Sequence, residues 1–224
     1  MISSDQFTRP ELTFDPPTHT YHWKGTKCIS VTEFIALFKS PFDDKKMAAQ
    51  KALERGNTQE AILEEWTSIR NEASDYGNKA HAIAAESVRN KHRGVALAEV
   101  PICLPNYLLA GTVDLLYVTP GGTKGILDWK TNKKMNVLGY TYMLPPLNTL
   151  FDCNWNNYCL QLSLYAHILR ESYDFDATTL TLAHIPKGGP PKCTQILDYR
   201  KHVTKLLEWR RQHIDKRGDT NHDE

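Results

Sequence analysis

The sequence has no long apolar run and no marked excess of charge of one sign. None of its hydrophobic stretches approaches the ~18 residues that a membrane-spanning helix needs, and residues 1–17 lack the apolar centre of a secretory signal. We therefore expect no membrane association. A net charge of +1, from 27 basic and 26 acidic residues, excludes a histone-like polycation or an acidic tail protein. Local clusters of basic residues would have to bind any polyanionic partner.

Cysteine is also scarce. The chain has 5 cysteines and no C-x-x-C pair, which indicates free thiols rather than a disulfide framework. We accordingly expect an intracellular, reducing compartment. The cytoplasm of a bacterium or of a phage-infected cell is favoured, and the mitochondrial matrix comes second. The sequence shows no internal repeat and no low-complexity tract. Its 224 residues, 41% of them hydrophobic, are enough for one domain with a buried hydrophobic core and an additional accessory region.

Residues 1–71 have the pattern of an accessory region, a small hairpin followed by helices. The alternation over 20–28 favours the hairpin. Ser30 and Glu33 are spaced as a capping box, in which each side chain satisfies a backbone N–H of the other residue, so a short helix should begin here. A second, charge-rich helix is expected over 43–66.

From residue 72 onward the pattern predicts the order αβββαβ. Helical spacing of apolar residues and β-like runs separated by turn residues support this order. The expected elements are a helix over 72–92, strands over 95–104, 108–119 and 124–131, a helix over 156–171, a strand pair around 186–191 and a final helix over 199–214. The predicted fold class is therefore α/β, a mixed central sheet flanked by helices. Its core covers 72–214, the accessory region 1–71, and a polar tail 215–224.

Two acidic residues interrupt the apolar strands. Asp114 lies within one predicted strand and Asp128 near the end of the next. If these strands pair as a hairpin, the two carboxylates lie on one face at neighbouring positions. Adjacent carboxylates repel each other unless a cation lies between them, and hard divalent ions prefer oxygen ligands. The pair therefore favours a metal site, although Asp128 and Lys130 taken alone would fit a surface ion pair.

Four further polar residues fit the same centre. His81 flanks the apolar stripe of the 72–92 helix, and Glu99 interrupts the first β-run. Each also fits a structural role, as a core histidine or as an outward-facing strand residue. Gln161 and Tyr165 are four apart and share a helix face. A glutamine on an apolar face needs hydrogen-bond partners, which a phosphate oxygen or the Lys130 ammonium would supply.

These residues form an order of motifs that resembles a known family. The motifs are Gly77-x3-His81, Gly111-x2-Asp114, Asp128-Trp129-Lys130 and Gln161-x3-Tyr165. They resemble the RecB-like exonuclease branch of the PD-(D/E)XK (restriction-endonuclease-like) nuclease superfamily. Within it, they are most similar to small phage and mitochondrial-genome-maintenance-type exonucleases. The resemblance covers roughly residues 72–186 and, more loosely, residues 21–33. It implies a PD-(D/E)XK core.

The resemblance also implies roles for individual residues. It implies metal ligands at His81, Asp114, Asp128, the backbone carbonyl of Trp129 and, less securely, Glu99. The implied cofactor is Mg²⁺ or Mn²⁺, as one or two ions. The implied catalytic residues are Lys130 together with the acids Asp114, Asp128 and Glu99, and the implied contacts to the DNA backbone are Gln161 and Tyr165. Some relatives hold an iron–sulfur cluster, but this sequence lacks the C-terminal cysteine cluster that would bind one, so we expect none.

The function that follows from the resemblance is a metal-dependent DNA exonuclease. It would act on single-stranded or frayed ends and leave 5′-phosphate and 3′-hydroxyl products. Lys133, Lys134 and Tyr140 follow the centre in a loop and would suit phosphates and stacked bases of a single strand, or would equally fit a solvated loop. A structure-specific or nonspecific endonuclease and a non-catalytic DNA-binding module remain open. DNA with a free end is the expected partner, with a single-strand-binding protein or a recombinase as the protein partner.

Overall fold

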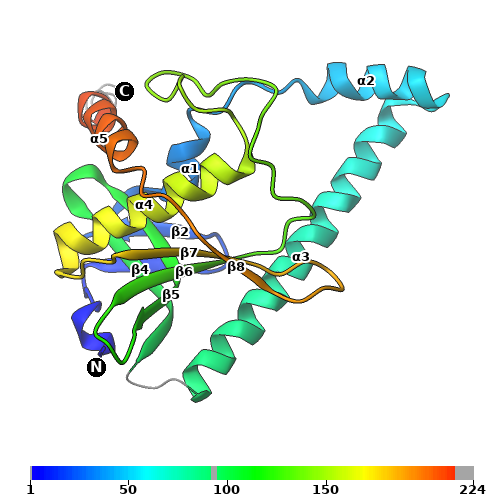
Figure 1. The fold of residues 1–224 in the computed structure, drawn as a ribbon. Helices are drawn as coiled ribbons and strands as arrows, with labels where there is room; N and C mark the ends of the chain where they lie inside the picture. Colours follow the sequence, from blue (N-terminus) through cyan, green and yellow to red (C-terminus); the bar gives the residue numbers. More distant parts are fainter. Residues whose placement is uncertain (1, 92–94, 215–224) are drawn as a thin grey trace.

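The computed structural model describes residues 2–91 and 95–214, which form an α/β fold around one mixed sheet (Figure 1). The elements in chain order are η1 (Ser4–Gln6), β1 (Leu12–Asp15), β2 (Thr20–Trp23), β3 (Thr26–Ser30), α1 (Val31–Ala36), α2 (Asp44–Arg55), α3 (Gln59–Lys91), β4 (Ala96–Leu104), η2 (Pro105–Tyr107), β5 (Leu109–Val118), β6 (Lys124–Lys130), α4 (Asn154–Tyr173), β7 (Thr179–His184), β8 (Lys192–Gln195) and α5 (Arg200–Ile214). The expected order αβββαβ is present from α3 to β7. Its assignment as a PD-(D/E)XK core remains a prediction.

The sheet is mostly antiparallel and follows the path β1-β2-β3-β5-β6-β7-β8, with β4 paired to β5. Two of its pairings are parallel, β3 with β5 and β6 with β7. The parallel β6–β7 pairing requires a crossover, and α4 provides it. The hairpins expected over 20–28, between 108–119 and 124–131, and around 186–191 are all present.

Helices cover both faces of the sheet. On one face α1, α4 and α5 pack over the larger core cluster, which includes Phe34, Leu116, Ile126, Leu160 and Leu206. On the other face the second half of α3 packs over a smaller cluster around Trp129. Residues of β6 contribute to both clusters because successive side chains of a strand point to opposite faces. The Asp128-Trp129-Lys130 motif therefore lies on a strand that is buried on both sides.

The first half of α3 corrects the sequence prediction. We expected one helix over 43–66 and another over 72–92, but the break lies earlier. Gly56 ends α2 with φ of +62°, a conformation that favours glycine, and the Thr58 hydroxyl accepts a hydrogen bond from the Ala61 N–H. From there α3 runs without interruption to Lys91. The expected boundary between residues 71 and 72 therefore falls inside a continuous helix.

The α2–α3 hairpin extends away from the sheet (Figure 1). At 33 residues, α3 is about 50 Å long. No helix in residues 2–91 or 95–214 is long and apolar enough to cross a membrane. The predicted polar tail, 215–224, lies outside the described residues.

The short helix α1 and the long loop after β6 hold each other in place. α1 begins with the expected capping box, in which the Ser30 hydroxyl accepts from the Glu33 N–H and the Glu33 carboxylate accepts from the Ser30 N–H. Just beyond α1, the N–H of Ser40 donates to the Asp152 carboxylate at 2.8 Å. The loop therefore leaves the end of β6 and returns to α4 along a fixed path.

Candidate active site

The centre of the site lies where one edge of β5 has no neighbour. Along one edge β5 pairs with β4 over nearly its whole length. Along the other edge β3 pairs with residues 109–110 and β6 with residues 115–118. Asp114 lies in the interval between these two neighbours. Because Leu127 stands opposite residue 115, Asp128 follows directly on β6, and the two acids come from adjoining strands as the sequence predicted.

Glu99 reaches the same point from β4, the strand on the other edge of β5. The register places it opposite Asp114. Its φ is +55°, a left-handed conformation that costs a non-glycine residue about 1–2 kcal/mol. Its Oε1 atom is buried and has no hydrogen-bond partner among the described residues. Backbone strain of this kind tends to persist at functional sites, where the surrounding structure enforces it.

An imidazole from α3 faces these acids. His81 Nδ1 lies 3.6 Å from Asp114 Oδ2, and His81 Nε2 lies 2.9 Å from the carbonyl oxygen of Trp129. Since a carbonyl only accepts, we assign the ring proton to Nε2, which leaves the Nδ1 lone pair facing the carboxylate. Burial lowers the pKa of His81 and so favours this neutral form. A lone pair facing a carboxylate is repulsive unless a proton or a metal cation lies between the two groups.

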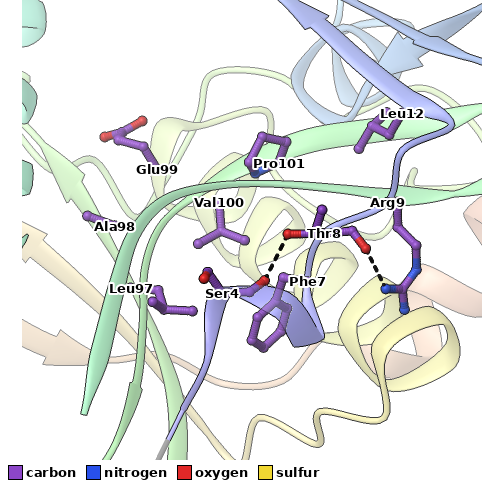
Figure 2. A pocket seen from close by; sticks show the side chains of 10 residues that line it. All are labelled: Ser4, Phe7, Thr8, Arg9, Leu12, Leu97, Ala98, Glu99, Val100 and Pro101. Carbon is purple, nitrogen blue, oxygen red and sulfur yellow. Dashed lines mark hydrogen bonds between the residues drawn. The ribbon is translucent and has the colours of Figure 1, made fainter. Parts of the chain in front are cut away.

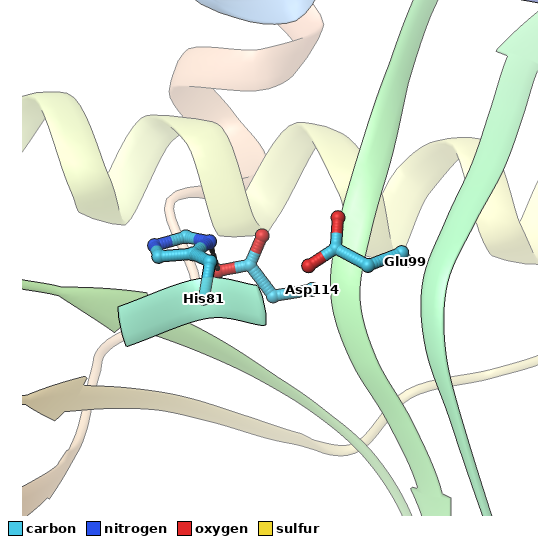
Figure 3. A group of neighbouring side chains, drawn as sticks. All are labelled: His81, Glu99 and Asp114. Atoms are coloured by element: carbon cyan, nitrogen blue, oxygen red, sulfur yellow. Dashed lines mark ion pairs between the residues drawn. The ribbon is translucent and has the colours of Figure 1, made fainter. Parts of the chain in front are cut away.

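His81, Glu99 and Asp114 form one group whose ligand atoms all lie within 4.8 Å of one another. Figure 3 shows the Asp114 carboxyl group between the His81 ring and the Glu99 carboxyl group. Burial raises the pKa of Asp114 well above its usual range, and the Asp128 carboxylate adds to the effect. Burial also raises the pKa of Glu99. Both shifts reflect the burial of acidic groups, whose charge a bound cation would compensate, and two carboxylates with one imidazole fit a divalent ion.

Asp128 and Lys130 lie beside this group in a hydrogen-bonded network. Lys130 Nζ is 2.7 Å from Asp128 Oδ2. Gln161 of α4 joins the two, since its Oε1 accepts from Lys130 at 3.3 Å and its Nε2 donates to Asp128 at 3.1 Å and to the Tyr165 hydroxyl at 3.2 Å. Burial alone would lower the pKa of Lys130, but the carboxylates of Asp128 and Asp114 outweigh it and raise the pKa. Lys130 is therefore protonated, and its ammonium group is held in place by Asp128 and Gln161.

Only some of the predicted metal ligands lie close together in the structure. His81, Glu99 and Asp114 converge, whereas the oxygens of Asp128 contact Lys130 and Gln161. The Trp129 carbonyl lies at the centre but already accepts from His81. Ligation by Asp128 and by the Trp129 carbonyl therefore remains a prediction.

The predicted DNA contacts fall into two sets. Lys133, Lys134 and Tyr140 are exposed, and the Tyr140 ring is completely so. Gln161 and Tyr165 are only 7% and 4% exposed. Both line the cleft, where Gln161 contacts Lys130 and Asp128 and the Tyr165 hydroxyl accepts from Gln161. A role for this second set in DNA binding remains a prediction, while its role in orienting the network is visible in the hydrogen bonds.

The buried acids, His81, Lys130, Gln161 and Tyr165 line one open cleft of about 900 Å³. The sequence did not predict one wall of this cleft. Tyr21 of β2 and Thr112 of β5 line this wall, and their hydroxyl oxygens are 2.9 Å apart. Tyr21 reaches the cleft because β3 joins β5 in a long-range parallel pair. Thr112 had one signal in the sequence, because it lies two residues before Asp114 and so shares its side of the strand.

A smaller, separate pocket of about 320 Å³ lies between the N-terminal segment and β4 (Figure 2). Arg9 donates to the main-chain oxygens of Gln6, Thr8 and Ser172, so its guanidinium is already engaged. In Figure 2 the Glu99 carboxyl group points away from Phe7 and Arg9. Because this pocket is largely apolar and its guanidinium is engaged, it is a poor candidate for chemistry.

The cysteines lie apart from the site. All five are free thiols, four of them buried and Cys193 exposed, and none lines the cleft. The expectation of no iron–sulfur cluster remains a prediction from the sequence.

No protein-family model matches the chain, and no curated protein matches its sequence. Among solved structures, the protein SSO0001 has a TM-score of 0.47 and 13% identity, covering 86% of this chain and 77% of its own. A "Putative exonuclease" from Eubacterium rectale has a TM-score of 0.39 and 12% identity, covering 84% and 79%. At these TM-scores the likeness carries no argument, so the function must be argued from the residues of the site.

Proposed function

We propose that this chain is a metal-dependent nuclease that hydrolyses phosphodiester bonds in DNA. One observation carries the proposal: His81, Glu99 and Asp114 converge beside the ion-paired Asp128 and Lys130 in an open cleft. The three ligands suit a hard divalent cation, and a fixed ammonium suits a phosphate. Phosphoryl transfer is the reaction class that needs both. The motif order, which resembles that of RecB-like exonucleases, supports the same choice.

The ligand set fits Mg²⁺ or Mn²⁺. His81, Glu99 and Asp114 would hold the ion, and Asp128 with the Trp129 carbonyl are further candidates. The buried Oε1 of Glu99, which lacks a hydrogen-bond partner in the described chain, supports the fit. When bound, such an ion lowers the pKa of its water and neutralises charge on phosphoryl oxygens.

The chain's own residues would orient the phosphate and stabilise its charge. Lys130 is fixed by Asp128 and Gln161 before any substrate arrives, so its ammonium needs little reorganisation when negative charge develops. Its raised pKa favours donating a hydrogen bond over accepting a proton. Gln161 would keep Lys130 and Asp128 in register, and Tyr165 would keep Gln161 in place.

We further propose that the substrate is a single strand or a frayed end, cut to 5′-phosphate and 3′-hydroxyl products. The fully exposed Tyr140 ring offers a surface on which a base can stack, and Lys133 and Lys134 offer charge for the adjacent phosphates. A separate experiment must distinguish digestion from an end from internal cleavage.

The test uses single-stranded DNA labelled at either end, in linear and covalently closed circular form, with Mg²⁺ or Mn²⁺. We expect digestion of the linear strand and an intact circle. Asp114→Asn and Lys130→Met should each lower the rate at least about 10²-fold, whereas Lys201→Gln on α5 should not change it. If the circular strand is linearised, the enzyme is an endonuclease and not an exonuclease. Binding without hydrolysis in every metal would leave a DNA-binding module and overturn the proposal.

A further inference from the structure

A second cleft, of about 790 Å³, opens on the other side of α3. It lies between α3, the end of β6, Tyr158 of α4 and the turn between β7 and β8. The walls of both clefts include Ala73, Ser74 and His81 of α3, Lys130 of β6 and the adjacent Thr131. At their junction the helix comes very close, because a Cβ added to Gly77 would lie 3.2 Å from Thr131 Oγ1. The two clefts therefore meet at the catalytic lysine of the proposed nuclease.

The two clefts have opposite charge. The wall of the second cleft carries Arg70, Lys130, Lys133 and Lys187 against the single acid Glu72. The wall of the first carries Glu86, Glu99, Asp114 and Asp128 against Arg89 and Lys130. A divalent ion at the proposed centre would offset the acids at its own position but leave Glu86 and the hydroxyl wall unchanged. A polyanion is therefore attracted to one cleft and much less to the other.

The second cleft also offers surfaces for bases. The half-buried rings of Tyr76 and Tyr158 line it, and Ile69 is 56% exposed. Lys130 Nζ lies 4.7 Å from the centre of the Tyr158 ring, so an aromatic face adjoins the reacting position. Cations that contact phosphates beside rings that stack on bases are the usual means of binding a single strand without sequence preference.

We propose that the uncleaved strand binds in the second cleft and that the short product leaves through the first. This assignment rests on the proposed nuclease function. A processing enzyme must hold a long polyanion and release a short one. The basic, aromatic cleft suits holding because many weak phosphate contacts add along the strand. The first cleft suits release because a divalent ion at the proposed centre would leave its wall with no net charge, so a product with few phosphates gains little there.

The first test measures strand binding without turnover. A fluorescein-labelled 20-nucleotide oligothymidylate is titrated in EDTA against wild type, Lys133→Gln/Lys187→Gln and the matched control Lys201→Gln/Lys205→Gln on α5. We expect the second-cleft variant to raise the Kd about tenfold and to reduce the salt slope of log K by about 1.4, that is, about 0.7 per lost phosphate contact. The α5 variant should match wild type. Equal effects of both pairs, or no effect of the first, would overturn the assignment.

The second test examines the product with Mn²⁺ present. Glu86→Gln should strengthen inhibition of 20-mer hydrolysis by thymidine 5′-phosphate several-fold, because it removes an acid from the exit. Lys133→Gln/Lys187→Gln should leave that inhibition unchanged. If the lysine variant changes the inhibition and Glu86→Gln does not, the proposed direction, with the strand in the second cleft and the product in the first, is wrong. Lysine-dependent binding in EDTA with no hydrolysis would contradict the nuclease function alone, whereas normal hydrolysis with lysine-independent binding would contradict the strand path alone.

Discussion

At the scale of the residue, Glu99 combines two unfavourable features. Its backbone has φ of +55° within a strand, and its Oε1 atom is buried with no hydrogen-bond partner among the described residues. Either feature alone costs on the order of 1–3 kcal/mol. The carboxyl group lies next to Asp114, where a cation would compensate for the buried charge. Stability and the proposed function therefore conflict at this residue.

The conformation of Glu99 predicts an inverted order of stability. In a strand, a protein with alanine at a given position is normally more stable than the same protein with glycine, by about 0.5–1 kcal/mol in the free energy of unfolding. At position 99 we expect the reverse, with Glu99→Gly more stable than Glu99→Ala by about 1 kcal/mol, because only glycine adopts this φ without strain. Urea unfolding in EDTA measures the difference. The neighbouring Ala98→Gly should show the normal order, and the same order at both positions would contradict the strained φ.

The sequence predicted the chemical groups of the site better than their contacts. Asp114 and Asp128 stood out because acids interrupted apolar strands, and the hairpin that joins them is readable from the turn between them. The unequal roles were not readable, because Asp128 is held by Lys130 while Glu99 reaches Asp114 through an unusual φ. Tyr21 was missed because its place depends on a parallel pairing between distant segments.

At the scale of the element, Gly111 sets the distance between β5 and α4. A Cβ at this position would lie 2.6 Å from Cε1 of the buried Tyr165 ring. Tyr165 in turn accepts from Gln161, which holds Lys130. The glycine of the Gly111-x2-Asp114 motif is therefore explained by the close approach of a ring rather than by backbone freedom.

Gly111→Ala should therefore destabilise the protein by overpacking. We expect a loss of about 1–3 kcal/mol in the free energy of unfolding, since neither the strand nor the buried ring can move freely. Gly121→Ala is the matched control, because an added Cβ there meets only Thr119 Oγ1 at 3.9 Å. Urea unfolding of both variants checks the prediction. If Gly111→Ala unfolds like Gly121→Ala, the close contact is not what requires the glycine.

The elements that the sequence predicted well are those that pack on both sides. β4, β5, β6 and α4 have apolar patterns that match their burial. The first half of α3 packs mainly against α2 and not against the sheet, so its stretch near residues 67–75 is polar and exposed and shows no apolar period. A helix held by propensity and one neighbour leaves a weak sequence signal, which is why its continuity was missed.

At the scale of the whole molecule, near-neutrality hides a separation of charge. The chain carries a net charge of +1, yet α3 divides a basic cleft from an acidic one. The same helix contributes His81 to the group that fits a divalent ion, while β4 and β5 contribute the acids. A bound ion would therefore join the helix to the sheet at the point where the two clefts meet.

A ligand shared by three elements should stabilise the fold as a whole. At 100 times its Kd, Mn²⁺ or Mg²⁺ should add about 2.7 kcal/mol to the free energy of unfolding, which is about 5–11 °C in Tm for a domain of this size. Thermal unfolding with and without EDTA measures the shift. Asp114→Asn should lose most of it, since one ligand becomes a neutral amide. Lys130→Met should keep it, because a cation is not a ligand, and would thereby separate metal binding from catalysis. An undiminished shift in Asp114→Asn would place the ion elsewhere and remove the basis of the proposed centre.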